Sequence, residues 1–335
     1  MKYNFAFLKK ILIVFLAVVL CLHCFTGCKK LFGKAEPTGA EVGNNDKAPA
    51  TAIVTVPGNA SDSPTAAPTE IPTEPPIERE KITIHFLDVG QGDSAFIELP
   101  GGKTMLIDAS VSKASDKIVS FISQKGYDKI DYLVATHPHA DHIGGMQAVV
   151  EAFDIGEIYM PRATTNTKTY ENLLLAIADK GMKIKAASAG MTICEGVEII
   201  APNSDKYDEM NDYSVVVKIT HDNRKFLFMG DAEVLSEKEI MTAGFDVSAD
   251  VVKVGHHGSG TSSSEAFVKA TGAKYAIFSV GEGNSYNHPH YFIVDRWEKS
   301  GATVYRTDLS GDIEVVSDGV SLEVKVLGGN YANNN

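Results

Sequence analysis

The sequence is short of cysteine, and the few cysteines that it has are gathered at one end. Three of the four lie within the first 28 residues, and only Cys194 lies beyond them. A single cysteine cannot form an intramolecular disulfide. The chain after residue 28 must therefore be stabilised by its hydrophobic core and by any metal ion that it binds.

Basic residues are also scarce. The chain has 31 Lys and Arg against 43 Asp and Glu, which gives a formal charge of −12 at neutral pH. Proteins that bind nucleic acid without regard to its sequence usually present a basic face. Because the body of the chain contains no dense run of Lys and Arg, we do not expect a long electrostatic track for DNA.

The N-terminal segment has the features of an export signal. Lysines precede an unbroken apolar run at residues 11–20, which is too short to span a bilayer comfortably. Small residues then precede Cys28, a pattern that resembles a bacterial lipobox. We expect residues 1–28 to be a lipoprotein signal peptide with Cys28 as the lipidated residue; the alternative is an uncleaved anchor. Both place the remainder outside the cell membrane, with the bilayer as a partner.

The next segment, residues 29–79, is rich in Pro, Thr, Ala, Ser, Gly and Glu and poor in large apolar side chains. Such a composition cannot bury enough surface to fold, so we expect a disordered tether that proline keeps extended. Residues 329–335 are expected to form a disordered tail. One folded domain is therefore predicted over residues 80–328.

Within that domain, short strand-like runs alternate with helix-like ones. Apolar residues recur with period two at residues 82–87, and helical patterns cover residues 115–125, 167–180, 232–242 and 291–300. Helices that flank mixed sheets indicate a layered α/β or α+β domain. Because polar loops repeatedly follow the strands, we expect a site at one rim of the sheets.

The strongest chemical signal is the motif that contains His137, His139, Asp141 and His142, directly after an apolar strand. Imidazole and carboxylate groups are ligands that suit zinc and neighbouring metals. In an extended loop, His137 and His139 can point to one metal, and Asp141 and His142 can point to a second. The alternative is a chance cluster of polar surface residues.

Two later loops contain further ligand candidates. Asp231 follows a buried-looking strand and Gly230, where it could bridge two cations; alternatively it caps the helix expected over residues 232–242. His256 and His257 follow another apolar strand and could either complete a metal site or belong to an ordinary polar loop.

In this order, the motifs resemble the metallo-β-lactamase fold family across essentially all of residues 82–327. They are most similar to the extracytoplasmic hydrolase domain of ComEC-type competence proteins. The segments that carry the resemblance are 86–94, 106–108, 137–142, 211–216, 229–233, 256–259, 287–290 and 305–311. The fold implied is an αββα four-layer sandwich, with two mixed β-sheets flanked by helices and metals at one edge of the sheets.

The resemblance also implies roles for individual residues. His137 and His139 would bind one divalent ion, Asp141 and His142 a second, and Asp231 would bridge them. One of His256 and His257 would complete the second position, with His257 preferred. Two Zn²⁺ ions are implied, and Mn²⁺ is compatible with the same ligands. Asp108 would orient a ligand imidazole. Further residues expected to line the pocket or to support the ligands are Asp88, Asp93, Asn211, Asp212, Ser214, Ser259 and Asn287.

One feature departs from the family pattern. Many members carry a further histidine ahead of the bridging acid, and this chain has none at that spacing. The segment that begins at Asn211 and ends at Ser214 takes its place. The departure predicts that the first metal position is open, weakly held or without a metal.

Two cations close together would activate a water molecule and neutralise a phosphate oxygen. Asp141, Lys253 and His288 are the catalytic candidates, the last two for stabilising charge or protonating the leaving oxygen. For Lys253 the alternative is a solvated lysine at a strand end. For His288 the alternatives are a third metal site with His290 or a helix cap.

The predicted function is that of an extracytoplasmic, membrane-tethered phosphodiesterase or nuclease acting on DNA, with single-stranded DNA as a candidate substrate. Three alternatives stay open. They are a phosphodiesterase for phosphocholine-type groups on the cell surface, a lactonase or β-lactamase, and a non-catalytic lipoprotein that captures DNA. Fold alone does not decide among them. The sequence names no protein partner.

Overall fold

The computed structural model of the chain describes residues 79–328. The expected signal peptide with Cys28, the expected tether except for its last residue, and the expected C-terminal tail lie outside these residues. Within the described part, no helix is both long and apolar enough to cross a membrane.

The first sheet has eight strands in the order β15-β14-β1-β2-β3-β4-β5-β6. Strands β3 to β6 pair in parallel, whereas the other neighbours pair antiparallel. The strands are β1 (Ile82–Phe86), β2 (Ala95–Glu98), β3 (Thr104–Ile107), β4 (Lys129–Val134), β5 (Asp154–Met160), β6 (Ile184–Ala186), β14 (Ile313–Ser317) and β15 (Leu322–Val326).

The second sheet has seven strands in the order β13-β12-β11-β10-β9-β8-β7. Strands β10 to β13 are parallel and β7 to β10 are antiparallel, so this sheet is mixed as well. The strands are β7 (Met191–Cys194), β8 (Val197–Ala201), β9 (Val216–His221), β10 (Arg224–Phe228), β11 (Val251–Lys253), β12 (Tyr275–Phe278) and β13 (Thr303–Arg306).

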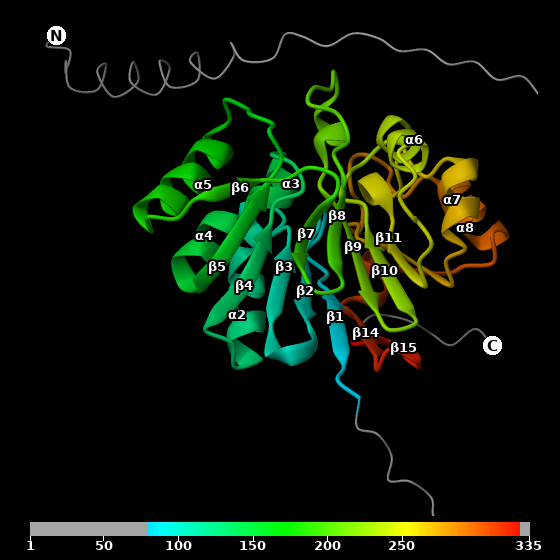
Figure 1. Cartoon of the computed structure of the whole chain (residues 1–335), viewed down its shortest axis with the longest axis horizontal. Coiled ribbons are helices and arrows are strands. Elements are labelled where there is room, and N and C mark those ends of the chain that lie inside the picture. Colours follow the sequence, from blue (N-terminus) through cyan, green and yellow to red (C-terminus); the bar gives the residue numbers. More distant parts are fainter. Residues whose placement is uncertain (1–78, 329–335) are drawn as a thin grey trace, which may run out of the picture. The chain divides into compact units, whose positions relative to one another are not determined.

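Helices cover the outer face of each sheet (Figure 1). On the first sheet these are α2 (Ser115–Gln124), α4 (Met146–Ala152) and α5 (Lys168–Asp179). On the second they are α6 (Val234–Thr242), α7 (Glu265–Thr271) and α8 (Tyr291–Lys299). Two one-turn helices, α3 (Ala140–Ile143) and α9 (Thr307–Ser310), lie in loops. The predicted αββα arrangement of two mixed sheets flanked by helices is confirmed.

Strand β1 shows how the alternating sequence builds these layers. Ile82, Ile84 and Phe86 belong to the core between the two sheets, and Phe86 stacks on Phe228 of β10 with ring centroids 5.8 Å apart. Burying each such side chain contributes roughly 1.5–3 kcal/mol. His85 points to the opposite face, toward the helices, and is only 1% exposed.

His85 is buried beside a carboxylate on the neighbouring strand. Its Nε2 donates a hydrogen bond of 2.9 Å to Glu98 of β2. That hydrogen bond, together with the ammonium of Lys125 at 3.1 Å, outweighs the effect of burial and lowers the pKa of Glu98 to about 2. Because the pKa falls on folding, this pair stabilises the fold above the unfolded-state pKa of Glu98, and the stabilisation is lost as the pH falls toward 2.

Glu98→Gln is therefore expected to lower the free energy of unfolding by about 1 kcal/mol at pH 6. It should also reduce the loss of stability that the unmodified protein shows between pH 4.5 and pH 2. Urea unfolding in the presence of a chelator, followed through the fluorescence of Trp297, measures both effects. Glu171→Gln, at an exposed position on α5, is the control. A pH profile for Glu98→Gln that matches the control would contradict this explanation.

Candidate metal centre

Loops from both sheets meet at one edge of the sandwich. Asp108 follows β3, the loop with His137 follows β4, Asp231 follows β10 and His257 follows β11. In each case the loop leaves the carboxyl end of a strand that has a parallel neighbour. Loops at the carboxyl ends of parallel strands share an edge and commonly form sites.

One group of ligand atoms is formed by His137, His139 and Asp231, and these atoms all lie within 4.8 Å of one another. Nε2 of His137 lies 2.9 Å from Nδ1 of His139 and 3.8 Å from Oδ2 of Asp231. The two histidines stand two residues apart in the loop after β4, and their rings meet edge-on with centroids 4.6 Å apart.

A second group is formed by Asp141, His142, Asp231 and His257, again within 4.8 Å. Oδ1 of Asp231 lies 3.2 Å from Nε2 of His142 and 3.4 Å from Nε2 of His257. Nε2 of His257 lies 3.4 Å from Oδ2 of Asp141. Asp231 belongs to both groups, so its two oxygens occupy the position of a bridging carboxylate.

The chemistry of this centre fits divalent cations. Nε2 of His142, Nε2 of His257 and Oδ1 of Asp231 are buried, converge on one point and make no hydrogen bond. Buried polar atoms without a partner are rare because each costs free energy. Imidazole nitrogens and carboxylate oxygens that share a focus are the donors that zinc and manganese accept.

The charges in the centre also favour cations. Burial alone would raise the pKa of Asp231, but the neighbouring imidazoles of His142 and His257 outweigh it and hold that pKa well below its ordinary value. Asp93 and Asp108 are fully or almost fully buried close by. A buried cluster of carboxylates with several neutralisable imidazoles attracts positive charge.

Asp108 lies beside one of the imidazoles and fixes its orientation. It is completely buried and lies 2.7 Å from Nδ1 of His142, which donates to it. Its oxygens also accept hydrogen bonds from the backbone N–H and the hydroxyl of Thr136, at 2.8 and 2.6 Å. The ring of His142 is thereby fixed with Nε2 toward the centre.

His257 is oriented by a different set of groups. Its Nδ1 donates to the carbonyl oxygen of Ser279 at 2.9 Å and lies 3.2 Å from Asp93. Asp93 is in turn paired with the ammonium of Lys253, which also donates to the carbonyl of Gly230 at 2.9 Å. Lys253 is 3% exposed. The expectation that Lys253 reaches a substrate is corrected, and so is the alternative of a solvated lysine, because Lys253 is buried behind Asp93.

The two adjacent histidines occupy different places. His257 is buried within the second ligand group. His256 lies beside it, with Nδ1 3.0 Å from the hydroxyl of Thr261 and 3.2 Å from Glu233. Both histidines have positive φ, 48° and 51°, a conformation that costs free energy for residues other than glycine and is often retained at functional sites.

A cavity of about 340 Å³ opens above the ligands. The side chains that line it come from both sheets. They are Gln91, His139, Ala140, Asp141, Asn211, Asp231, His256, His257, Tyr286 and His288. His288 belongs to this lining, on the side of the cavity next to His256 and His257. Tyr286 also lines the cavity, and the sequence analysis does not predict it. The signal that could have indicated it is an aromatic residue in a polar segment, directly before Asn287 and His288.

The segment that replaces the missing histidine contributes two of its members to the centre. The hydroxyl of Ser214 accepts a hydrogen bond of 3.0 Å from the backbone N–H of Asp231 and lies 3.4 Å from Nδ1 of His137. Asn211 donates to Glu233 at 3.0 Å and lies 3.4 Å from His256. Ser214 therefore holds the backbone of Asp231, and Asn211 forms part of the cavity wall.

Four expected residues lie away from the cavity lining. The carboxylate of Asp88 accepts the backbone N–H of Gly90. Asp212 accepts the backbone N–H groups of Glu233 and Ser236 and so caps α6. Ser259 accepts hydrogen bonds from Thr261, and the backbone N–H of Asn287 donates to Asn284. These contacts shape the surrounding loops, so of the two expected roles, lining the pocket or supporting the ligands, the four residues do not take the first.

The alternative for Asp231 is excluded by the start of the following helix. Helix α6 begins at Val234, and its N-terminal cap position is occupied by Glu233. Asp231 is therefore not a helix cap, and its side chain is available to the centre. Ser264, in contrast, caps α7 by accepting the backbone N–H of Phe267 at 3.3 Å.

Comparison with known proteins identifies the class. Residues 87–282 match the metallo-beta-lactamase superfamily, and the chain belongs to this superfamily of metal-dependent hydrolases.

Among characterised proteins, the chain is 28% identical over 251 residues to ComE operon protein 3 of Bacillus subtilis (strain 168), covering 69% of this chain and 32% of that protein. It is 29% identical over 228 residues to competence protein ComA of Neisseria gonorrhoeae, covering 68% of this chain and 31% of that protein. The chain thus spans about a third of the length of these relatives. The solved structure of a CmlA beta-hydroxylase variant is similar with a TM-score of 0.49 at 17% identity, over 72% of this chain and 54% of that one.

The two adjacent histidines provide a test of the ligand assignment. His257→Ala should remove about one zinc ion per chain, because it deletes a donor of the second group. His256→Ala should leave the zinc content unchanged. Elemental analysis of both full-length variants after loading with zinc and removal of the excess measures this. Loss of zinc from His256→Ala, with the zinc content of His257→Ala unchanged, would refute the assignment.

The buried Lys253 provides a second test. Lys253→Met should lower the free energy of unfolding by about 3 kcal/mol, because it leaves the carboxylate of Asp93 buried without its main partner. Lys274→Met removes an ammonium that is 60% exposed and paired with Asp250, so it should cost less than about 1 kcal/mol. Urea unfolding of both variants in a chelator gives the comparison. An equal loss of unfolding free energy in Lys253→Met and Lys274→Met would show that Lys253 is not an essential partner of Asp93.

Proposed function

We propose that this protein is a metal-dependent phosphodiesterase that cleaves nucleic acid outside the cell membrane, to which its N-terminal segment tethers it. The observation that carries the proposal is the pair of ligand groups that share Asp231 at the floor of an open polar cavity. The names of the competence-protein relatives support DNA as the substrate. Their similarity covers only about a third of each relative.

His137, His139 and Asp231 would hold one divalent cation, and Asp141, His142, Asp231 and His257 would hold the second, as Zn²⁺ or Mn²⁺. Two such ions, when bound, supply activation of water and neutralise charge on a phosphate oxygen. Among the described residues, none that lines the cavity is Lys or Arg, and Lys253 is paired with Asp93. The affinity of the cavity for an anionic phosphodiester therefore depends on the ion-binding centre rather than on basic side chains.

The residues of the cavity wall position the substrate. Burial and the neighbouring imidazoles of His256 and His257 lower the pKa of His288 to about 4, so its ring is neutral at pH 7. A neutral imidazole can donate one hydrogen bond to a phosphate or leaving oxygen, but it does not supply a positive charge. The amide of Asn211 and the ring of His256 face the same space and can contact the other oxygens.

The location is proposed from the sequence. A signal peptide over residues 1–28, a lipid on Cys28 and a flexible tether would hold the catalytic domain at the outer side of the cell membrane. A domain held at this position can act on DNA that reaches the surface of the cell.

The assignment of the reaction is tested with a panel of substrates. We expect full-length protein loaded with Zn²⁺ or Mn²⁺ to cleave an oligonucleotide, and to leave a phosphocholine ester and a cephalosporin essentially intact. Asp141→Ala should reduce cleavage at least about 100-fold, because Asp141 belongs to the second ligand group and faces the cavity. Product formation is followed by electrophoresis and absorbance.

Asp179→Ala, at an exposed position at the end of α5, is the matched control and should keep full activity. Hydrolysis of the cephalosporin without cleavage of DNA would contradict the proposal. Equal activity of Asp141→Ala and Asp179→Ala would contradict it as well.

A further inference from the structure

Exposed aromatic side chains are concentrated in one short segment. Among the described residues, those with large exposure are Tyr286 at 61%, Tyr291 at 82% and Phe292 at 50%. All three fall within seven consecutive residues, between β12 and the first turn of α8. Aromatic side chains gain free energy from burial, so a local group of exposed rings marks a surface that another molecule covers.

This segment, residues 286–292, adjoins the metal centre. Tyr286 and His288 line the cavity above the ligands. The ring of His288 lies nearly parallel to that of the ligand candidate His257, with centroids 6.4 Å apart and an angle of 26°. Tyr286 stacks on His288 at 5.7 Å and 24°. A row of rings therefore leads from the centre to an exposed tyrosine.

The row also continues in the other direction. His290 packs edge-on against His288 at 5.1 Å, and Phe292 stacks on His290 at 5.5 Å with an angle of 13°. We call the rings of Tyr286, His288, His290 and Phe292 the aromatic ledge. Its exposed ends are Tyr286 and Phe292, and its middle is half-buried.

The ledge is held in place by hydrogen bonds and close packing. The side chain of Asn284 accepts the backbone N–H groups of Tyr286 and His288 and donates to the carbonyl of His288. The backbone N–H of Gly260 donates to Nδ1 of His290 at 2.8 Å. A Cβ on Gly260 would lie 2.7 Å from the tip of the Phe292 ring, so the backbone at Gly260 packs closely against this end of the ledge. The rings are thus preorganised, which lowers the entropy cost of stacking a ligand on them.

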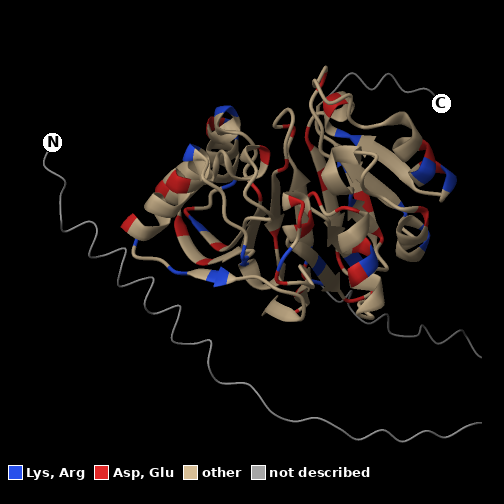
Figure 2. Cartoon of the chain, turned by 90° about the horizontal axis from the view of Figure 1, so that it is seen from above, with Lys and Arg blue, Asp and Glu red and all other residues tan. Residues whose placement is uncertain are grey.

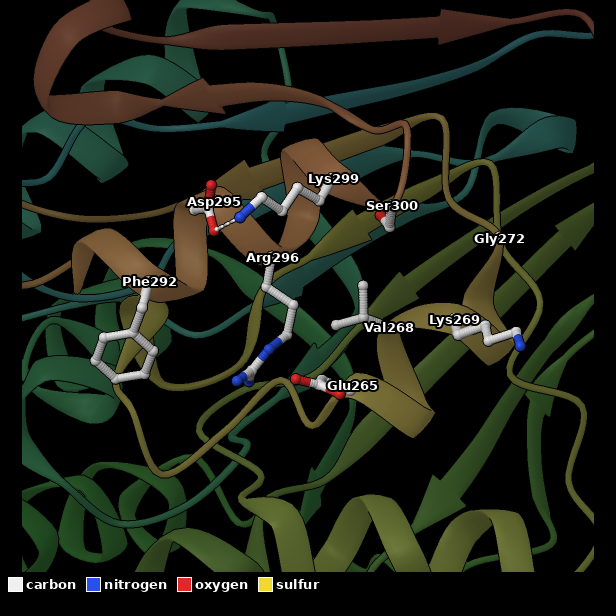
Figure 3. A pocket seen from close by; sticks show the side chains of 9 residues that line it. All are labelled: Glu265, Val268, Lys269, Gly272, Phe292, Asp295, Arg296, Lys299 and Ser300. Carbon is white, nitrogen blue, oxygen red and sulfur yellow. Dashed lines mark hydrogen bonds and ion pairs between the residues drawn. The ribbon is translucent and has the colours of Figure 1, made fainter.

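Beyond Phe292, the ledge opens into a second cavity of about 610 Å³ between α7 and α8. Figure 3 shows Asp295 paired with Lys299, and Arg296 directed toward Glu265. Lys269 points away from these groups, and its ammonium makes no hydrogen bond or ion pair within the described part of the chain. The ammonium of Lys269 is therefore available to an anion at the rim of this second cavity.

We propose that the aromatic ledge binds the unpaired bases of a single-stranded nucleic acid, with Tyr286 stacking on the base next to the phosphate at the metal centre. This inference rests on the proposed function and specifies its substrate. Every base has a flat face that can stack on an aromatic ring, whereas a base within a duplex has both faces covered by its neighbours. Tyr286 therefore selects single strands without selecting a sequence.

The charge distribution favours stacking over phosphate contacts. Lys and Arg are spread over several elements and intermixed with Asp and Glu (Figure 2), and the chain is acidic overall. A protein that binds through many phosphate contacts loses affinity steeply as salt is added. Here Lys269 offers one such contact, so the affinity for a single strand should depend only weakly on salt.

The experiment compares two labelled 12-nucleotide strands, one of oligothymidine and one in which every nucleotide lacks its base. Binding to full-length protein is measured by fluorescence anisotropy in a chelator, which separates binding from cleavage. We expect the oligothymidine to bind at least about tenfold more tightly. Tyr286→Ala should weaken its binding about tenfold and leave the abasic strand unchanged, and Tyr286→Phe should restore the difference.

Leu175→Ala, which truncates an exposed side chain on α5, is the control and should alter neither affinity. Equal binding of the two strands, or an equal effect of Tyr286→Ala on both, would overturn the inference. The inference would also be overturned if Tyr286→Ala lost binding to phosphatidylglycerol vesicles but kept its affinity for oligothymidine. In that case the ledge would be a membrane contact.

Cleavage by the metal-loaded protein separates this inference from the proposed function. Equal cleavage of both strands would overturn the ledge as a base-binding site and leave the phosphodiesterase intact. Base-dependent binding through Tyr286 without cleavage of either strand would support the ledge and contradict the phosphodiesterase.

Discussion

The carboxylate of Asp231 joins the two ligand groups, and the centre depends on its position. The chain fixes that position from three sides. Gly230 adopts a positive φ of 52°, where a Cβ would lie 2.8 Å from Thr136, so the close turn requires glycine. Lys253 holds the carbonyl of Gly230, and Ser214 accepts the backbone N–H of Asp231. The oxygens of Asp231 therefore face the imidazoles before any ion binds.

The same carboxylate also links the two sheets. His137 and His142 follow a strand of the first sheet, whereas Asp231 and His257 follow strands of the second. The ligands can meet only while the apolar core between the sheets keeps them in register. Because Phe86 and its partners in that core hold the sheets together, stability and metal affinity are coupled in this fold.

The sequence predicts the parts of this arrangement that are local. The period-two alternation of β1 gives the face that enters the core, and the spacing of His137 to His142 places four donors in one loop. It does not predict what depends on distant packing. From its place in the sequence, Lys253 could be a solvated lysine at a strand end, and only the folded structure brings Asp93 beside it. Asp231 could likewise be a helix cap, and only the observed start of α6 at Val234 excludes this role. Tyr286 was missed because exposure is a property of the folded surface.

The most direct test of this account is the crystal structure of the zinc-loaded protein, with anomalous diffraction measured at the zinc absorption edge. The account predicts two zinc peaks roughly 3.5–4 Å apart, each in contact with one oxygen of Asp231, and with His257 rather than His256 beside the second. A single peak that does not contact Asp231, or the absence of any peak among these residues, would contradict it.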